Sequence, residues 1–489
     1  MTRTMVCLCL LIALLLARVS AAEPAPAWSP LRIAPMDLRE AERLKEEAAV
    51  RRAELGYLYA IPAFLHLRQR YQFAHNTITY QKVDNPFGRF FVVRQPAGPE
   101  TQDTMPNQDT LYGATFLDLD FGPYVLSVPG ILDRYYAFNF IDAYFYNFDF
   151  VSSRTDGAAA GDYLIVGPAW KGAAPAGIRR VVHAPTRWIN VYQRIHFRDA
   201  MDIANVHRLQ DSIQLRPLAV YLDKTAVAAQ PDPKEVLTAN PLSVRNPREM
   251  LTMANAYMTM NPPPVEDRAL VDSFKAVGIG PGASLPADAA GVDIIMKGAE
   301  QAQKTIASLY LTALETRHGW QLPRTDMGVR GGESAVPLHA MTQIRSIGYN
   351  AAKEAVYYLA LTDQRGEALT PGDRYVLKFE KDQIPPVARN TPGFWSLVAY
   401  DSERFGFVKN DARKYVVRSS DKLVYDQDGS LTLHVQKEPP ANPEKLPNWL
   451  PAPDRPQFVM MLRVFQGDGS VVEGRYTPPG IVKVPRSLD

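Results

Sequence analysis

The sequence predicts an α+β protein with mainly β structure, in which two β regions flank a helical middle region. Short runs of β-branched or aromatic residues, bounded by Gly, Pro or Asp, fill residues 87–196 and return from about residue 374 to the end. Such spacing is typical of antiparallel sandwiches. Between about residues 199 and 361, apolar residues instead recur every three or four positions, which is the period of helices.

The first 22 residues have the pattern of a secretory signal peptide. Arg3 precedes an uncharged apolar run over residues 6–17, and small residues follow it. This pattern predicts cleavage after Ala21 or Ala22. The run is shorter than the roughly 20 apolar residues that a membrane-spanning helix needs. We therefore expect a mature chain that opens near Glu23, has no stable membrane anchor, and is periplasmic or secreted.

Cleavage of this signal leaves a mature chain without cysteine, because Cys7 and Cys9 both lie within it. Disulfides, zinc-thiolate sites and cysteine nucleophiles are therefore excluded. Loss of Arg3 and Arg18 also lowers the basic total from 54 to 52 against 52 acidic residues, and the formal net charge from +2 to 0. A nucleic-acid or anionic-membrane partner is disfavoured, because such partners require clustered Lys and Arg.

The chain divides into a signal, a lead and three further regions. These are residues 1–22 for the signal, 23–86 for a Pro-rich lead and a helix, 87–198 for a β-sandwich, 199–366 for the helical region and 367–489 for a second antiparallel β-sandwich. The lead helix is expected from Asp37, an N-cap with Glu40 three residues on, to about Tyr59, with Pro62 perturbing any continuation of the helix.

Helical periodicity and turn signals predict the later elements. Helices are expected over residues 200–215, 247–260, 265–277, 292–314 and 334–361. The pairs Asp428-Gly429 and Asp468-Gly469 predict hairpin turns between strands of the C-terminal region.

The stretch from Tyr136 to Phe150 places one carboxylate in an otherwise aromatic face. Alternate residues are Tyr or Phe, with Asp142 as the exception. The stretch exceeds a typical strand in length, so we expect a bulge or break inside it. A carboxylate among rings must have a raised pKa, pair with a cation such as Arg134, or accept hydrogen bonds from backbone and tyrosine groups.

Several motifs resemble two bacterial families. Residues 105–112 (Met-Pro-Asn-Gln-Asp-Thr-Leu-Tyr), 126–129, 134–136, 141–144 and 161–168 resemble the domain of unknown function 1254, and residues 392–397, 400–401, 428–432 and 448–453 resemble the domain of unknown function 1214. The resemblance implies an immunoglobulin-like sandwich, a helical insert and a C-terminal jelly roll, and no established reaction. The family usually has Asn where Gln108 stands and Arg where His339 falls, so we expect a different specificity if either position contacts a ligand.

No established catalytic motif is present. The serines lack the second glycine of a nucleophile elbow, and the eight histidines lack metal-binding spacing. The glycine-rich run over residues 278–282 contains a proline that removes an amide donor from any phosphate loop. We therefore expect no metal or cofactor, and the catalytic residues, if any, stay unassigned.

The polar turn Asn107–Thr110 and the aromatic face around Asp142 are the best candidates for a ligand site. The candidate residues are Asn107, Asp109, Tyr112, Arg134, Asp142 and Tyr144, with Trp395, Tyr400 and Trp449 as aromatic walls. Amides and carboxylates supply the paired donors and acceptors that hydroxyl-rich ligands need, and rings stack on sugars. In the structural alternative, Asp109 caps its own turn and Asp142 anchors a strand against Arg134.

Three functions are compatible with these features. The first is an exported binder of a small polar molecule or glycan. The second is a hydrolase that uses Asp109 and Asp142 as an acid/base pair, which requires carboxyl groups about 5 to 9.5 Å apart. The third is an envelope scaffold protein that presents an exposed apolar patch to other proteins. Homo-oligomers are compatible with each of them.

Overall fold

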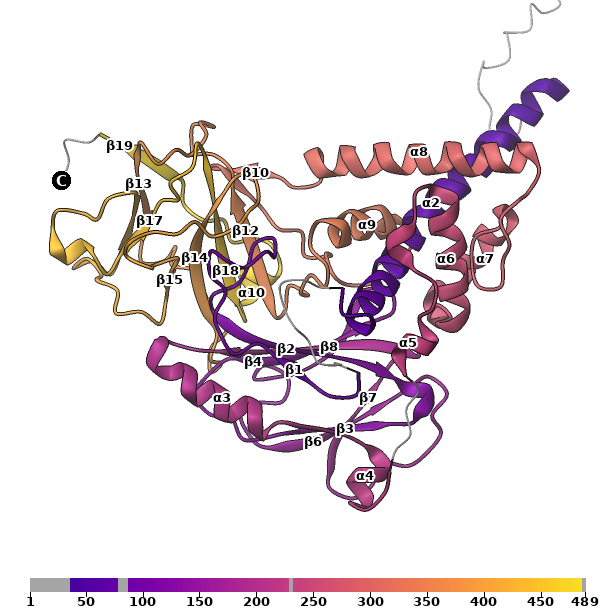
Figure 1. Ribbon diagram of the computed structural model, residues 1–489. Helices are drawn as coiled ribbons and strands as arrows, with labels where there is room; N and C mark the ends of the chain where they lie inside the picture. The colour runs from indigo at the N-terminus through magenta and orange to yellow at the C-terminus, as the bar shows by residue number, and fades with distance from the viewer. Residues whose placement is uncertain (1–35, 78–86, 228–231, 486–489) are drawn as a thin grey trace, which may run out of the picture. The chain divides into compact units, whose positions relative to one another are not determined.

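The computed structural model describes residues 36–77, 87–227 and 232–485 of the chain (Figure 1). The predicted signal peptide and its cleavage site lie outside these residues. The chain divides into two compact units, Met1–Ala48 and Ala49–Asp489. In the first unit, the described part is the start of helix α2 (Leu38–Ala74), where the Glu40 amide donates a hydrogen bond to Asp37 Oδ1 at 2.8 Å. The predicted N-cap is confirmed.

Helix α2 continues to Ala74 instead of ending near Tyr59, so the predicted end is wrong. Pro62 lies inside the helix, where a proline removes one backbone donor and costs about 3 kcal/mol. Leu58 and Ala63, on either side of it, are fully buried in the core of the helical region. This packing offsets the lost hydrogen bond, because tertiary contacts supply most of the stability of a helix in a protein.

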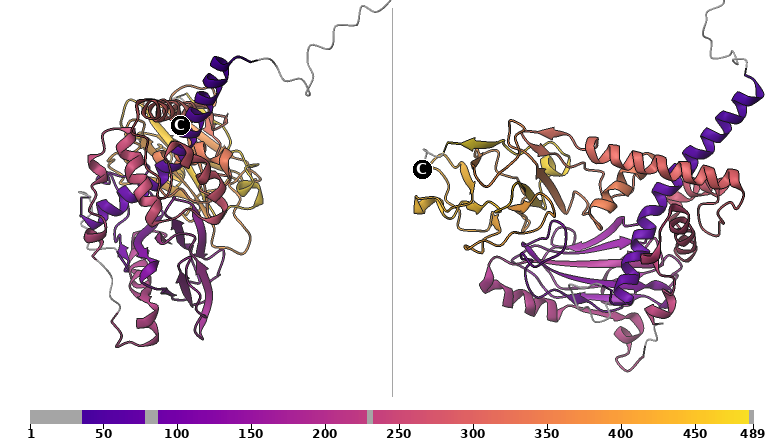
Figure 2. Two further views of the ribbon diagram at one scale, coloured as in Figure 1. Left: turned by 90° about the vertical axis from the view of Figure 1, so that its right-hand side faces the viewer. Right: turned by 45° about the horizontal axis from the view of Figure 1, so that its top comes forward.

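Two sheets form the N-terminal β region, with the strand orders β1-β2-β8-β4-β5 and β7-β6-β3-β9. The strands are β1 (Phe91–Val92), β2 (Thr110–Asp118), β3 (Tyr124–Val128), β4 (Tyr136–Asp142), β5 (Asn147–Ser152), β6 (Gly161–Val166), β7 (Ile178–His183), β8 (Trp188–His196) and β9 (Gln214–Pro217). Leu126, Phe138 and Val191 belong to the core between the sheets. Figure 2 shows the strands of the five-stranded sheet side by side. The expected sandwich is present.

The sandwich extends past its predicted boundary at residue 198. Helix α3 (Ile203–Ser212) is shorter than the helix expected over residues 200–215, because Gln214–Pro217 form β9 and pair with β3. The amphipathic pattern of residues 200–215 does not show that the last of them join a sheet. Their pairing with β3 depends on the tertiary structure, which brings the edge of that strand next to them.

The aromatic stretch from Tyr136 to Phe150 contains the expected break. It forms a hairpin of β4 and β5, joined by residues 143–146, with a register shift between Phe140 and Ile141. The stretch therefore does not present one continuous face. Tyr136, Phe138 and Phe140 contribute to the sandwich core, whereas Tyr144 and Tyr146 contribute to the core of the helical region.

Helices α4 to α9 fill the middle of the chain. They are α4 (Leu218–Leu222), α5 (Pro233–Val236), α6 (Pro247–Met260), α7 (Arg268–Phe274), α8 (Ala289–Thr312) and α9 (Val336–Arg345), with the 3₁₀ turns η4 (Val265–Asp267), η5 (Lys275–Val277) and η6 (Glu333–Ala335) among them. Helix α6 matches its predicted range. The helix expected over residues 334–361 ends at Arg345, because residues 355–360 form a strand of the C-terminal region.

The C-terminal region contains two sheets, with the orders β10-β11-β12-β18-β14-β15 and β17-β16-β13-β19. The strands are β10 (Thr316–Arg317), β11 (Trp320–Gln321), β12 (Ala355–Ala360), β13 (Arg374–Phe379), β14 (Phe394–Asp401), β15 (Val416–Arg418), β16 (Leu431–Gln436), β17 (Trp449–Pro451), β18 (Phe458–Phe465) and β19 (Ile481–Val484). A core that includes Trp395, Leu433 and Leu462 joins these sheets. The second sandwich is present, although β16 and β17 pair in parallel.

The two predicted hairpin turns are wrong. Asp468 caps the short helix α10 (Gly469–Val472) by accepting hydrogen bonds from the amides of residues 470 and 471. Asp428-Gly429 forms a turn before β16, but β15 and β16 belong to different sheets. An Asp-Gly pair specifies a tight turn, whereas the pairing of the flanking strands depends on the rest of the fold.

The N-terminal and C-terminal β regions meet at a small apolar cluster within the second unit. Tyr135 lies next to β4, and its ring centroid is 5.2 Å from that of Phe465 on β18 and 6.0 Å from that of Phe394 on β14. Ala137 and Ala355 complete this cluster. The outer face of the five-stranded sheet is thereby held against the C-terminal sheet, and the junction between them is the setting of the candidate site.

Candidate functional site

Asp142 closes the turn of the β4–β5 hairpin. Its Oδ1 accepts hydrogen bonds from the amides of Tyr144 at 2.8 Å and Tyr146 at 3.0 Å. Phe145, between them, has a left-handed φ of 60°, which a non-glycine residue adopts only at some cost in strain. The side chain of Asp142 is completely buried. One oxygen of the carboxylate is therefore used to shape the backbone of the turn.

The cation beside Asp142 is Arg330, and the predicted partner Arg134 is wrong. Arg330 Nη2 donates to Asp142 Oδ2 at 2.6 Å, while Arg330 Nη1 contacts Asp267 Oδ2. The Tyr59 hydroxyl also donates to Asp267, at 2.7 Å. Burial raises the pKa of Asp142, and the charge of Arg330 and the two amides oppose only part of this rise. Arg330 thus fastens the hairpin to η4 and α2.

Arg134 lies at the other end of β4. It donates to Asp202 at 2.7 Å and to Asp133 at 3.0 Å. Although burial by itself raises the pKa of Asp202, hydrogen bonds from Arg134, Asn205 and the Arg198 amide lower it to about 2. Arg134 therefore acts as an anchor for the segment that leads into α3.

Asp109 and Asp142 lie at opposite ends of β8, which contradicts an acid/base pair. The Phe197 amide, just past β8, donates to the Asp109 carbonyl at 3.2 Å, whereas Asp142 pairs with Ile189. Eight residues of extended chain separate Phe197 from Ile189, which corresponds to about 26 Å at roughly 3.3 Å per residue. This spacing is far beyond the range that paired catalytic carboxylates need.

The polar turn that precedes β2 is bound to the C-terminal sheet. Asn107 Oδ1 accepts from the Asp109 amide at 2.5 Å and forms an Asx turn, so the cap is Asn107 and the cap predicted at Asp109 is wrong. The carboxylate of Asp109 accepts from Ser396 Oγ on β14 at 2.6 Å and from Arg418 Nε on β15 at 3.2 Å. Asn107 Nδ2 also donates to the Tyr112 hydroxyl at 3.0 Å. The turn therefore connects the two sandwiches.

Tyr400 joins this turn, whereas the two tryptophans do not. The Tyr400 hydroxyl donates to the Pro106 carbonyl at 2.5 Å. Trp395 lies on the opposite face of β14, in the C-terminal core, 5.9 Å from the ring of Phe379. Trp449 is buried and donates to the Gln436 carbonyl at 2.9 Å. Of the predicted site residues, the structure brings together Asn107, Asp109, Tyr112 and Tyr400.

Two arginines at the same junction were not among the predicted site residues. Arg463 on β18 is 2% exposed, and its Nη2 donates to the carbonyls of Met105 and Pro106 at 3.0 and 3.3 Å and to the Tyr400 hydroxyl at 2.6 Å. Its Nη1 has no hydrogen-bond partner among the described residues. Arg194 on β8 is 7% exposed and donates to Asn139 Oδ1 at 2.7 Å. Within the described ranges, no carboxylate contacts either guanidinium.

Each of these arginines has a tyrosine as its cross-strand neighbour. Tyr112 pairs with Arg194 in the N-terminal sheet, and Tyr357 pairs with Arg463 in the C-terminal sheet. Side chains directly opposite in a sheet have Cβ atoms roughly 5 Å apart on the same face. Both tyrosines are partly exposed. Tyr112, Arg194, Tyr357 and Arg463 are called the Tyr–Arg cluster below.

A chain of hydrogen bonds connects the two halves of the Tyr–Arg cluster. Arg194 donates to Asn139, whose Nδ2 donates to Asn350 Oδ1 at 2.5 Å, and Asn350 Nδ2 donates to the Tyr357 hydroxyl at 2.5 Å. The guanidinium of Arg194 lies 5.3 Å from the ring centroid of Tyr112, a cation–π distance. Burial raises the pKa of Tyr357, and the charge of Arg194 opposes this rise.

The sequence around one of these arginines indicates that it is buried. Arg463 is the single charged residue in the otherwise apolar strand 458–465, which is the pattern of a buried cation. Arg194 alternates with apolar residues on β8 and gives a weaker signal. Arg330 lies in a glycine-rich loop, where no periodicity indicates which residue it contacts.

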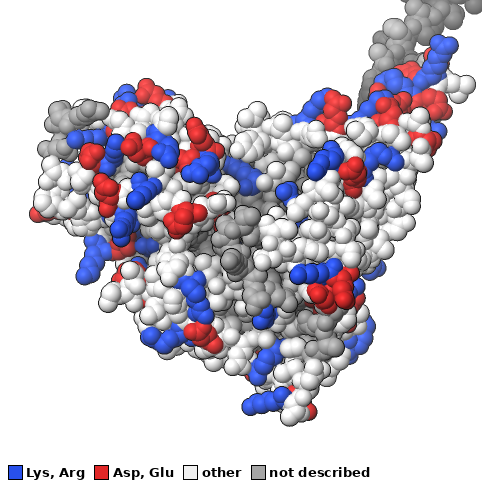
Figure 3. All heavy atoms as spheres, viewed as in Figure 1, with Lys and Arg blue, Asp and Glu red and all other residues white. Residues whose placement is uncertain are grey.

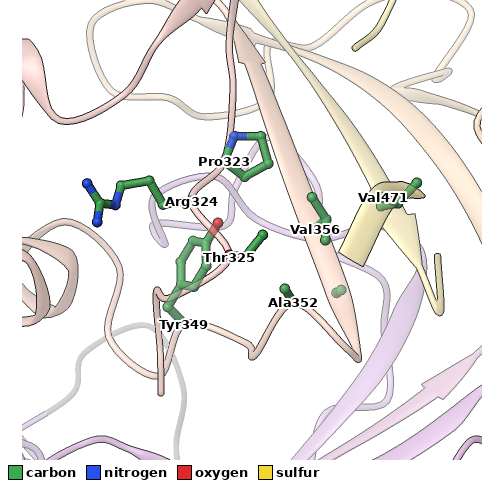
Figure 4. Close-up of a pocket in the computed structure, with 8 residues that line it drawn as sticks. Pro323, Arg324, Thr325, Tyr349, Ala352, Val356 and Val471 are labelled. Atoms are coloured by element: carbon green, nitrogen blue, oxygen red, sulfur yellow. The ribbon is translucent and has the colours of Figure 1, made fainter. Parts of the chain in front are cut away.

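Two small cavities lie away from the Tyr–Arg cluster. One, of about 180 Å³, is lined by residues that include Tyr59, Tyr144, Tyr146 and His339. The other, of about 210 Å³, is lined by residues that include Tyr349 and Val356, and the guanidinium of Arg324 points away from it (Figure 4). Neither has room for a water molecule, so neither is a small-molecule pocket.

The side chain of His339 lines the first cavity and is uncharged. Its ring stacks on Tyr146 with centroids 3.7 Å apart, and its Nε2 contacts the Tyr144 carbonyl at 2.8 Å. Because a carbonyl accepts, Nε2 carries the proton, and Nδ1 is an acceptor without a partner among the described residues. Burial lowers the pKa of His339 to about 3. This side chain therefore stays uncharged near neutral pH.

The described part of the chain contains no group of three or more His, Cys, Asp or Glu side chains that could hold a metal ion. It also contains no helix whose length and apolar character would allow it to cross a bilayer. On the face drawn in Figure 3, Lys and Arg side chains are interspersed with Asp and Glu side chains.

Residues 87–217 match the family model described as "Protein of unknown function (DUF1254)", and residues 354–468 match "Protein of unknown function (DUF1214)". The VPA0106 protein from Vibrio parahaemolyticus has a similar structure, with a TM-score of 0.70, 22% identity, and coverage of 89% of this chain and 100% of that chain. A protein from Burkholderia cenocepacia gives a TM-score of 0.45, 13% identity, and coverage of 90% and 96%. The first likeness shows the fold alone. No curated protein matches the sequence.

The arrangement at the hairpin predicts the behaviour of an Arg330→Met variant. Loss of the guanidinium leaves Asp142 buried without its cation, so we expect the free energy of unfolding at pH 7 to fall by about 3 kcal/mol. The deficit should shrink as pH is lowered. Because the pKa of Asp142 is raised in the folded state, protonation of this carboxyl favours folding, and that stabilisation is lost as pH rises through the raised pKa. Urea unfolding at several pH values measures both effects.

Arg324→Met is the matched control, because Arg324 forms a surface ion pair with Asp326 at 2.6 Å. We expect that variant to change stability by less than about 0.5 kcal/mol. Equal losses in the two variants, or a deficit of Arg330→Met that does not depend on pH, would contradict the role assigned to Arg330.

Proposed function

We propose that this chain, which combines a DUF1254 domain with a DUF1214 domain, is an exported protein that binds a small polar molecule at the junction of its two β regions. One observation carries the proposal. Arg194 and Arg463 are buried, no carboxylate among the described residues contacts them, and each is the cross-strand neighbour of a partly exposed tyrosine.

The energetic argument starts from the cost of burying a guanidinium. Removing an ion from water costs several kcal/mol unless partners replace the lost hydration. For Arg463, two carbonyls and a hydroxyl replace part of it, and for Arg194 one amide oxygen, the Tyr112 hydroxyl and aromatic rings do so. A ligand that accepts hydrogen bonds from these groups would supply the remainder.

The surroundings of the Tyr–Arg cluster are preorganised. Asn107 is fixed by its bonds to the Asp109 amide and the Tyr112 hydroxyl, and Asp109 is fixed by Ser396 and Arg418. Binding then requires little ordering of side chains, which improves affinity. Junctions between domains are also frequent locations of small-molecule sites.

The Asp142 region supports a structural role instead. Its carboxylate oxygens are used by two amides and by Arg330, and the adjacent cavity is small. The ligand site is therefore proposed at the polar turn with Tyr400, and Asp142, Tyr144 and Arg134 are left out of it. The two sandwiches are proposed to be immunoglobulin-like at the N-terminus and jelly-roll-like at the C-terminus.

Export to the periplasm or beyond is part of the proposal and rests on the pattern of the first 22 residues. N-terminal sequencing of the chain recovered from the periplasm or the medium is expected to begin at Ala22 or Glu23. Recovery of the chain only from the cytoplasm with its first residues intact would refute export.

Thermal-shift screening of sugars, acyl compounds and aromatic acids tests the binding function. A compound at 100 times its Kd is expected to stabilise the folded chain by about 2.7 kcal/mol and so to raise its Tm. We expect the shift to be reduced in a Tyr112→Phe/Tyr357→Phe variant, because the two hydroxyls are lost while the rings remain.

Tyr425→Phe serves as the control, because this tyrosine is exposed on the surface and is not part of the Tyr–Arg cluster. If a stabilising compound acts equally on the wild type and on the folded double variant, the site lies elsewhere in the chain. If no class of compound changes the Tm, the binding function is wrong.

A further inference from the structure

The junction contains more arginines than carboxylates, although Arg154 and Asp421 are partly exposed. Arg418 contacts Asp109 at 3.2 Å, and Arg154 contacts Glu354 at 2.7 Å. Asp421 lies 3.9 Å from Arg418 and is a third carboxylate. The four arginines Arg154, Arg194, Arg418 and Arg463 therefore face three carboxylates. No carboxylate of the described residues is in direct contact with Arg194 or Arg463. The carboxylates of Asp109 and Glu354, which act on Arg463 and Arg194 electrostatically, are each in contact with another arginine.

The two unpaired guanidiniums belong to one site. Tyr112 influences the pKa of both arginines, and Tyr357 is influenced by both. The register places one arginine on each of the two sheets that meet here, and the Asn139–Asn350 bridge connects them. A ligand that contacts both sheets can therefore accept hydrogen bonds from Arg194 and Arg463.

We infer that the ligand is a small organic anion whose carboxylate is held by Arg463 and Arg194, an inference that rests on the binding function proposed above. A guanidinium presents its N–H groups in a planar fork that matches the two oxygens of a carboxylate. Arg463 Nη1 is buried and has no partner among the described residues, so it is available for such an oxygen. The rings of Tyr112 and Tyr357 provide surfaces for the remainder of the ligand.

Matched pairs of compounds separate the charge of the ligand from its shape. The purified mature chain is titrated with benzoate and benzamide, with gluconate and glucose, and with inorganic phosphate, and Tm and Kd are measured for each. We expect at least one carboxylate to raise the Tm and to bind at least ten-fold more tightly than its neutral partner.

Two variants test the residues. Arg463→Gln and Arg194→Gln are each expected to weaken binding of that carboxylate at least ten-fold, whereas Arg455→Gln, on the exposed surface, leaves it unchanged. Circular dichroism establishes that each variant is folded. If Arg463→Gln does not fold, Arg463→Lys keeps the charge but loses the fork, and it is also expected to bind the carboxylate less tightly than the wild type does.

Several results would overturn the inference. A neutral compound that binds as tightly as its carboxylate, with the shift lost in Tyr112→Phe/Tyr357→Phe, would leave the binding function intact and refute the anion. Unchanged carboxylate binding in both folded glutamine variants would refute the two arginines. Preference for phosphate over every carboxylate would refute the ligand class, and no response to any of these probes would also refute it.

Discussion

The desolvation of buried guanidinium groups is the constraint on which this structure depends. Arg330, Arg134 and Arg418 each contact a carboxylate and thereby fix a loop, a strand end or a turn in place. Arg194 and Arg463 are also buried, but their direct contacts are carbonyls, an amide, hydroxyls and rings. Buried ion pairs specify a fold, whereas a buried cation without its anion is costly unless something else compensates it. This difference separates the structural arginines from the candidate ligand site.

Strand β8 determines how these groups are distributed. Its first residues pair with the end of β4 and lead to the hairpin tip at Asp142, and its last residues lead to the polar turn at Asp109. One end of the five-stranded sheet thus meets the helical region and the other meets the C-terminal sheet. The two aspartates that the sequence suggested as a catalytic pair consequently have separate roles. Asp142 lies at the hairpin, and Asp109 lies at the junction.

The sequence predicted what depends on local chemistry. The order of β, helical and β regions, the cap at Asp37 and the break in the aromatic stretch all follow from nearby residues. The Asx cap was predicted at Asp109, but the capping side chain is Asn107. The continuation of α2 through Pro62 and the added strand β9 depend on packing against distant segments. The partner of Asp142 could not be predicted for the same reason, because Arg330 is 188 residues away along the chain. Side chains of β14 alternate between its two faces, and that of Trp395 faces the core. Periodicity alone does not show which face of the strand contacts the core.

The stability of an Arg194→Met variant, measured by urea unfolding of the ligand-free protein, tests the central claim most directly. If Arg194 is a buried cation kept for an absent anion, an apolar side chain of similar length should leave the free energy of unfolding unchanged or raise it. A loss of about 3 kcal/mol or more, as expected when a compensated buried ion pair is broken, would show that Arg194 is structural and would contradict the account.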